Sequence, residues 1–167
     1  SIPEGALVAF LRAVVDAYLA AGFSHVCLVS NHLEPAHDAA VRKAIDGAAA
    51  GRASVASPLT RRHARTLSDV FKSGACHAGR YETSLVLAAA PDLVDRAAAA
   101  ALPPLGASLS DGIRRGVTRF ADLGMARAYT GAPAEATIEE GEDLYARLAD
   151  MIVAETVEGL GARESHA

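Results

Sequence analysis

Residues 25–30 read HVCLVS, and this short run of apolar and β-branched residues decides the fold class. It lacks the polar–apolar alternation of a strand with one face in water, so it predicts a strand covered on both faces of a parallel sheet. Before it, apolar residues recur at steps of three and four over residues 6–21. That spacing predicts a helix with one buried face, which ends at Gly22.

The same order of elements repeats after this strand. Residues 37–50 are rich in alanine and charged residues and predict a helix closed by Gly51, and residues 53–57 predict a weaker strand. Helix, strand, helix, strand within so short a segment is typical of a layered α/β domain with right-handed crossovers. We therefore expect an α/β protein with three layers, α/β/α, around a mainly parallel sheet.

The middle of the chain has a weaker pattern. Residues 58–74 show no clean period, and no element is assigned to them beyond one helical turn. Residues 81–90 predict a helix that Pro91 ends. The proline- and glycine-containing stretch over residues 103–133 predicts extended chain at the surface.

The last predicted element is a long helix that runs to Leu160. Thr137 followed by Glu140 is a capping-box pattern, which marks its start, and the acidic first turn suits the helix dipole. The residues expected to face the core are Ile138, Leu144, Leu148, Ile152 and Val153.

Length and composition limit the class of protein. The 167 residues match one ordinary domain, so we expect a single domain over residues 1–167. The net charge of −4 argues against a nucleic-acid partner, which needs a basic surface. No apolar stretch approaches the roughly 20 residues of a membrane span, so no membrane association is expected. Two cysteines and no secretion signal indicate a reducing, cytoplasmic location.

The first polar cluster, residues 30–34, directly follows the best strand. Ligands of open parallel sheets bind beyond the carboxyl ends of the strands, which places this cluster at a candidate site. His32 and Glu34 are two residues apart, so in extended chain both side chains point to one side and can share a cation. The alternative is a polar loop in which Asn31 and Glu34 cap the following helix.

The second polar cluster, residues 74–84, surrounds His77 with small residues that let a ligand approach. Glu82 has a structural alternative, favourable placement at a helix N-terminus, and Thr83 or Ser84 can cap the same helix. Cys76 beside His77 raises the hypothesis of a thiol nucleophile, but no third orienting group can be identified.

Four segments resemble the creatininase family of metal-dependent amidohydrolases. Residues 22–32 are similar to the family's segment from Gly-Phe through a strand to Asn-Gly-His, without the glycine before the histidine, and residues 32–34 have the His-x-Glu form. Residues 77–84, HAGRYETS, match the motif HAGxxETS in full. Residues 129–141 resemble the stretch before the family's terminal helix. The four motifs stand in the family's order and span nearly the whole chain.

The resemblance implies a function and a set of site residues. It implies hydrolysis of a cyclic or linear C–N amide bond at a site with two divalent metal ions, zinc or manganese. His32 and Glu34 are then metal ligands, His77 is the general acid/base, and Glu82 is a catalytic carboxylate that supports or joins the metal site. The candidate substrate-binding residues are Asn31, Cys76 and Tyr81.

The resemblance also sets expectations about assembly. The family's other metal ligands lie in an N-terminal E-x-H-G pattern that this sequence lacks, so we expect the chain to be the C-terminal two thirds of a member. It is expected to be either a truncated or processed piece or a chain whose site is completed by a separate N-terminal segment. The sequence has no tryptophan to enclose creatinine, and the expected substrate is a small-molecule amide or a peptide. A homo-oligomer is expected, because members of the family commonly assemble as hexamers. The alternatives are a peptide-trimming member and a non-catalytic interaction subunit.

Overall fold

The computed structural model describes residues 2–49, 51–74, 77–117 and 119–164. The chain divides into two compact units, residues 1–63 with 148–167 and residues 64–147. The long C-terminal helix α8, Ile138–Glu164, contributes residues to both.

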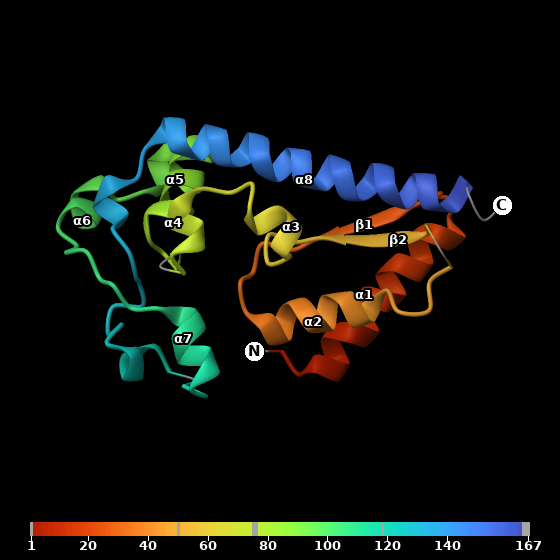
Figure 1. Cartoon of the computed structure of the whole chain (residues 1–167), viewed down its shortest axis with the longest axis horizontal. Coiled ribbons are helices and arrows are strands. Elements are labelled where there is room, and N and C mark those ends of the chain that lie inside the picture. The colour runs from red at the N-terminus through yellow and green to blue at the C-terminus, as the bar shows by residue number, and fades with distance from the viewer. Residues whose placement is uncertain (1, 50, 75–76, 118, 165–167) are drawn as a thin grey trace. The chain divides into compact units, whose positions relative to one another are not determined.

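The first unit contains the predicted alternation of helices and strands (Figure 1). Its elements are α1 Glu4–Ala20, β1 Val26–Val29, α2 Pro35–Ala44, β2 Ala53–Ala56 and α3 Arg61–Ala64. β1 and β2 pair in parallel, with Val26 opposite Ala53. The parallel pair and the α/β class are confirmed, whereas the three-layer arrangement stays a prediction. The second helix is shorter than expected, because it ends at Ala44.

The apolar faces of α1 and α2 form part of the core of this unit, together with β2. Val15 of α1 is 2% exposed, and Val41 of α2 is 4% exposed. Arg12 of α1 donates through its guanidinium to the carbonyl oxygens of Lys43, at 2.8 Å, and Ala44, at 3.3 Å. These carbonyls lie in the last turn of α2, where the carbonyl of Lys43 also accepts the N–H of Asp46 at 3.3 Å, and the side chain of Arg12 thus joins the two helices.

The ring of His25, just before β1, contacts residues at the start of β2 and in α8. Its Nδ1 lies 2.8 Å from the carbonyl oxygen of Gly51, and its Nε2 lies 2.9 Å from Oγ of Ser54. The ring packs directly against Gly159 of α8, where a Cβ atom would lie 2.9 Å from Nδ1. A side chain at position 159 would therefore displace this histidine.

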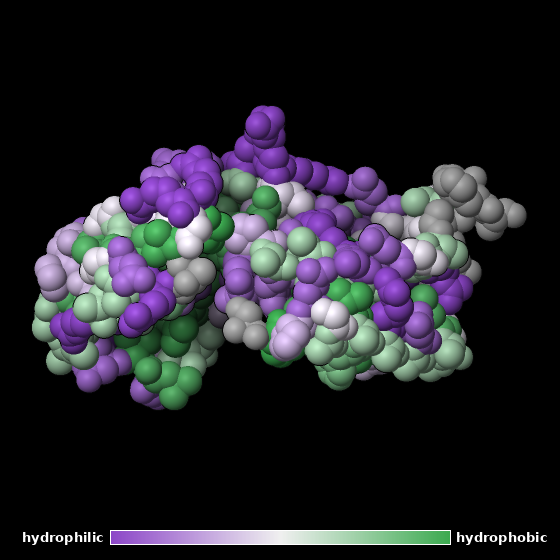
Figure 2. Space-filling view, turned by 90° about the horizontal axis from the view of Figure 1, so that it is seen from below, coloured by the Kyte–Doolittle hydropathy of each residue, from purple (hydrophilic) through white to green (hydrophobic). Residues whose placement is uncertain are grey.

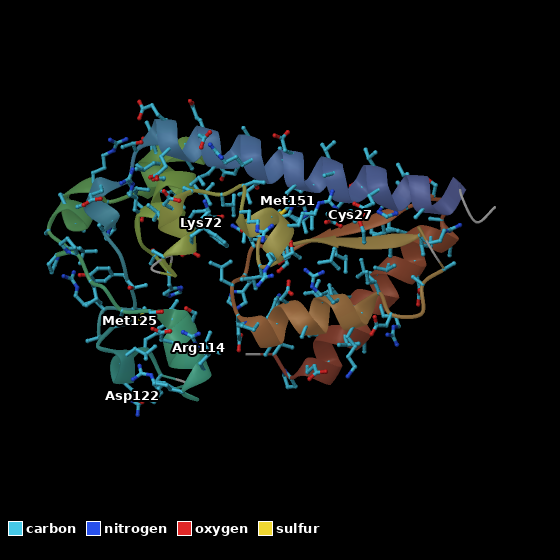
Figure 3. The ribbon with its side chains drawn as sticks, viewed as in Figure 1. Cys27, Lys72, Arg114, Asp122, Met125 and Met151 are labelled. Carbon is cyan, nitrogen blue, oxygen red and sulfur yellow. The ribbon has the colours of Figure 1, made fainter. Side chains whose placement is uncertain are left out.

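The expectation that β1 is covered on both faces is wrong for this chain. Val29 at the end of β1 is 56% exposed, and Cys27, labelled in Figure 3, is only half-buried. Within the described residues β1 pairs with a single strand, so less of it is covered than in a larger parallel sheet. Apolar residues also reach the surface elsewhere on the chain (Figure 2). Phe10 and Tyr18 of α1 are among the exposed large apolar side chains.

The second unit consists of short helices connected by loops. Its elements are α4 Asp69–Lys72, α5 Arg80–Ala89, η1 Pro91–Leu93, α6 Arg96–Ala100, α7 Leu109–Arg114, η2 Phe120–Leu123, η3 Pro133–Glu135 and the first turns of α8. The helix expected over residues 81–90 is confirmed. Residues 58–74, which carried no assignment beyond one turn, contain two single-turn helices, α3 and α4.

The expectation of extended surface chain over residues 103–133 is wrong. This segment contains α7 and η2, and Met125, labelled in Figure 3, is 1% exposed. Thr130 is fully buried, and its hydroxyl donates to the carbonyl oxygen of Leu105 at 2.9 Å. The segment thus supplies part of the core of the second unit, because its turns bring isolated apolar residues inward without a periodic pattern.

The start of α8 follows the predicted capping pattern only in part. Oγ1 of Thr137 accepts the N–H of Glu140 at 3.1 Å, as an N-cap residue does. Leu144 is fully buried, as expected, but Val153 is 60% exposed and Met151 is buried instead. In the described part of the chain, no helix contains an apolar stretch long enough to cross a bilayer.

Candidate functional site

His32 and Glu34 lie in the loop that leaves the carboxyl end of β1. Nε2 of His32 is 3.4 Å from Oε2 of Glu34, so the two side chains point to the same side, as their spacing predicts. The side chains are 61% and 40% exposed, which leaves the pair open to solvent and to an approaching ligand.

The helix α2 adds further polar groups next to this pair. The ring of His37 stands edge-on to the ring of His32, with centroids 4.8 Å apart. Burial raises the pKa of Asp38, but hydrogen bonds from Arg42 and Ser57 outweigh it, and the pKa of Asp38 is lowered overall. Asp38 is therefore an ionised partner of Arg42, 2.8 Å from Nε, and not a free carboxylate of the site.

The alternative that Asn31 and Glu34 cap the following helix finds little support. Glu34 occupies the N-cap position of α2, but its side chain makes no capping hydrogen bond, and Pro35 begins the helix. Asn31 is exposed and lies three residues before the cap. The polar character of this loop is thus not explained by capping of α2.

The geometry of the pair can be compared with that of a metal site. Two ligand atoms at about 2.0 Å from a tetrahedral zinc ion lie roughly 3.3 Å apart. The 3.4 Å between Nε2 of His32 and Oε2 of Glu34 agrees with this separation. Among the described residues, no group of three His, Cys, Asp or Glu side chains is placed to hold a metal ion. The pair fits two positions of a coordination sphere, and a complete sphere needs further ligands.

His77 and its surroundings form a second cluster, in the second unit. The ring of His77 packs against the ring of Phe120 from η2, with centroids 4.6 Å apart. Its carbonyl oxygen accepts the N–H of Thr130 at 2.9 Å. The side chain is half-buried, so the imidazole is held by its neighbours yet remains accessible.

Glu82 lies in the first turn of α5, as the structural alternative required. Its Oε2 accepts the N–H of Ala78 at 2.7 Å, just before the helix. The carboxylate thus reaches back to the residue before the Gly79 N-cap, one position further than in a capping box, and it also suits the positive end of the helix dipole. The structure thus gives Glu82 a definite local role next to His77, while its catalytic role stays a prediction.

Ser84 does not cap its own helix. Gly79 is the N-cap of α5 and no side chain caps it, whereas Oγ of Ser84 donates to Oε2 of Glu140 at 2.7 Å and accepts the N–H of Thr137 at 3.2 Å. Nε of Arg80 donates to the same Glu140 oxygen at 2.8 Å. The Glu140 carboxylate therefore joins α5 to the start of α8 instead of completing its own capping box.

The remaining candidates have different surroundings. Tyr81 is fully buried and its ring packs on Phe71, with centroids 5.2 Å apart. That packing supports the core of the second unit, and substrate binding by Tyr81 stays a prediction. Cys76 lies outside the described residues. The roles of Asn31 and Cys76 in substrate binding are untested.

The sequence reasoning missed three residues around His77. Phe120 and Thr130 contact it from a segment expected to be surface chain, and Ala78 has a left-handed backbone with φ of +46°. Thr130 belongs to a segment of family resemblance, but no local pattern marks Phe120. The two clusters belong to different compact units, and their convergence into one site stays a prediction.

Comparison with known proteins agrees with the motifs. The model of the creatininase family, described as creatinine amidohydrolase, matches residues 1–156. No curated protein and no solved structure matches the chain. The family match includes both polar clusters and the start of α8, and it brings with it an α/β fold and an amidohydrolase class of activity. The chain belongs to the creatininase family.

Proposed function

We propose that this protein is a metal-dependent amidohydrolase that hydrolyses a C–N bond of a small-molecule amide or a short peptide. The observation that carries the proposal is the His32–Glu34 pair, whose donor atoms lie 3.4 Å apart at the carboxyl end of β1. The family match supports the amidohydrolase class. The proposed scaffold is the three-layer α/β/α arrangement around a mainly parallel sheet.

His32 and Glu34 are the proposed metal ligands in this account. A divalent ion, zinc or manganese, supplies Lewis acidity that polarises an amide carbonyl, with two ions in a complete site. An imidazole nitrogen and a carboxylate oxygen are both accepted ligands of these ions. The further ligands are proposed to come from a separate N-terminal segment.

His77 is the proposed general acid/base. An imidazole exchanges protons readily near neutral pH, so it can deliver a proton to the leaving nitrogen when the C–N bond breaks. The half-buried position of His77 against Phe120 supports this role, because it restricts the ring while leaving it accessible. Asn31, Cys76 and Tyr81 remain proposed substrate contacts.

The proposed setting is a cytoplasmic homo-oligomer, with a hexamer as the form suggested by the family, and with neither nucleic acid nor membrane as a partner. The net charge of −4 supports the exclusion of nucleic acid. Size-exclusion chromatography with light scattering measures the oligomer directly, and a monomer at micromolar concentration would contradict this part of the proposal.

The test of the activity is a hydrolysis assay of this chain together with the separate N-terminal segment that supplies the further ligands. The substrates are a panel of cyclic amides, linear amides and short peptides, with zinc or manganese added. Product amine is measured with and without a chelator. We expect chelator-sensitive hydrolysis in the wild type and loss of most of the rate in His77→Ala. The matched control is Glu142→Ala, which removes an exposed carboxylate of α8 and should retain the rate.

The two alternatives give different results in the same assay. A peptide-trimming member would act on the peptides and leave the cyclic amides intact. A non-catalytic family member that serves as an interaction subunit would hydrolyse nothing with either metal, and that result would contradict the proposed function.

A further inference from the structure

Ala78, which follows His77, has an unfavourable backbone conformation. Its φ of +46° lies in the left-handed region, which L-residues other than glycine rarely adopt because the Cβ atom crowds the following carbonyl oxygen. Such a conformation persists only where its surroundings hold it. The contacts around Ala78 show what does so.

The peptide group between His77 and Ala78 is held at both of its polar ends. Its carbonyl oxygen, on His77, accepts the N–H of Thr130 at 2.9 Å. Its N–H, on Ala78, donates to Oε2 of Glu82 at 2.7 Å. A rotation of this peptide plane would break both hydrogen bonds at once, so its orientation is fixed.

The orientation of this peptide group constrains the backbone from which the His77 side chain projects. The Cα–Cβ bond of His77 is set by the backbone on each side, and the ring then meets Phe120 at a centroid distance of 4.6 Å. Phe120 is 40% exposed, so this contact alone leaves the imidazole room to move. The hydrogen bond from the Ala78 N–H to Glu82 restrains the backbone from which this side chain projects.

We propose that Glu82 is a positioning residue, which holds the His77–Ala78 peptide group through the Ala78 N–H and thereby directs the imidazole of His77 onto Phe120. This inference rests on the proposed function, in which His77 moves the proton. It assigns to Glu82 a hydrogen-bond acceptor role that needs an oxygen atom at this position and does not need a negative charge or a metal ion.

The matched variants separate the need for an acceptor oxygen from the need for a negative charge. Glu82→Gln keeps an acceptor oxygen of the same reach and removes the charge, whereas Glu82→Ala removes both. Glu142→Ala is the control, since it removes an exposed acidic side chain of α8. Any catalytic or ligand role that depends on the carboxylate charge would be lost in both Glu82 variants.

The readout is the NMR spectrum of protein labelled at its histidine rings, with no metal or substrate added. The sequence has six histidines, and the His77 signals are assigned by their absence in His77→Gln. Amide hydrogen exchange at Ala78 is measured on the same samples, and it reports the hydrogen bond to Glu82 directly.

We expect Glu82→Ala to shift the His77 ring signals, weaken their cross-peaks to Phe120 and accelerate exchange at Ala78, while the His25 and His63 signals remain in place. Glu82→Gln and Glu142→Ala should resemble the wild type. Unchanged His77 signals in Glu82→Ala, or equal shifts in Glu82→Gln and Glu82→Ala, would overturn the proposal. If Glu82→Ala does not fold, the test rests on Glu82→Gln. A shift of the His77 signals in Glu82→Gln would then overturn the proposal, and His77 signals at the wild-type positions would support it. None of these measurements depends on hydrolysis. Failure of the positioning role can therefore be distinguished from failure of the proposed function.

Discussion

Replacement of Gly141 by alanine should disrupt the crossing of α5 and α8. A Cβ atom on Gly141 would overlap the carbonyl oxygen of Ser84 and lie 2.7 Å from Cβ of Ala88. The overlap is with backbone, which cannot rotate away, so the two helices have to separate. Separation stretches the hydrogen bond from Ser84 to Glu140, now 2.7 Å, and the ion pair between Glu140 and Arg80.

The size of the effect follows from these contacts. Overpacking a close contact costs about 1–3 kcal/mol. Loss of a hydrogen bond to a charged group costs about 1.5–3 kcal/mol, whereas the gain in helix propensity from glycine to alanine returns up to about 1 kcal/mol. We therefore expect Gly141→Ala to lower the free energy of unfolding by about 2–5 kcal/mol.

The assay is urea unfolding followed by circular dichroism, which yields this free energy from the midpoint and slope. The matched control is Gly161→Ala in the same helix, where a Cβ would have nothing within 4 Å. It should leave stability unchanged or raise it by up to about 1 kcal/mol. If Gly141→Ala were as stable as Gly161→Ala, the close crossing would be refuted.

Three further predictions use the same unfolding assay. His63 is 4% exposed and its Nε2 lies 2.6 Å from Oε1 of Glu155, so His63→Ala should cost about 2–3 kcal/mol. Arg62→Ala, at a more exposed ion pair with Glu158, should cost less, and equal costs would contradict this. The pKa of Asp38 is lowered from 3.8, so the stability that this carboxylate contributes is complete above that pH and is lost as the pH falls further. Between about pH 4 and pH 2, Asp38→Asn should therefore lose less stability than the wild type. An equal loss in the two proteins would contradict this prediction. Ala128 has φ of +55°, so the free energy of unfolding of Ala128→Gly should be within about 1 kcal/mol of the wild-type value or above it. Ala128→Val should lower it by about 1–3 kcal/mol. The reverse order of the two variants would contradict the left-handed backbone.

The sequence patterns predicted the regular elements of the first unit because those elements repeat a local period. The apolar spacing over residues 6–21 corresponds to α1, and the run at residues 25–30 contains β1. The sequence patterns did not predict how much of β1 is buried, as the exposed Val29 shows. Coverage of a strand depends on which other segments pack on it, and a strand's own sequence does not encode that.

The candidate site was predictable where its residues belong to short motifs. The spacing of His32 and Glu34 predicted their common side, and the HAGxxETS motif contains both Glu82 and Ala78, whose N–H Glu82 accepts. Phe120 could not be predicted, because it reaches His77 through irregular turns. Side chains brought together by such turns leave no periodic signal in the sequence.

The pair of His32 and Glu34 as metal ligands is the central claim, and the metal content of the purified chain tests it most directly. After equilibrium dialysis against zinc or manganese, with the separate N-terminal segment present, bound metal is measured by mass spectrometry in the wild type, His32→Ala and His77→Ala. The account predicts that His32→Ala loses most of the bound metal and that His77→Ala keeps it. Equal metal content in the wild type and His32→Ala, or loss of metal in His77→Ala alone, would contradict it.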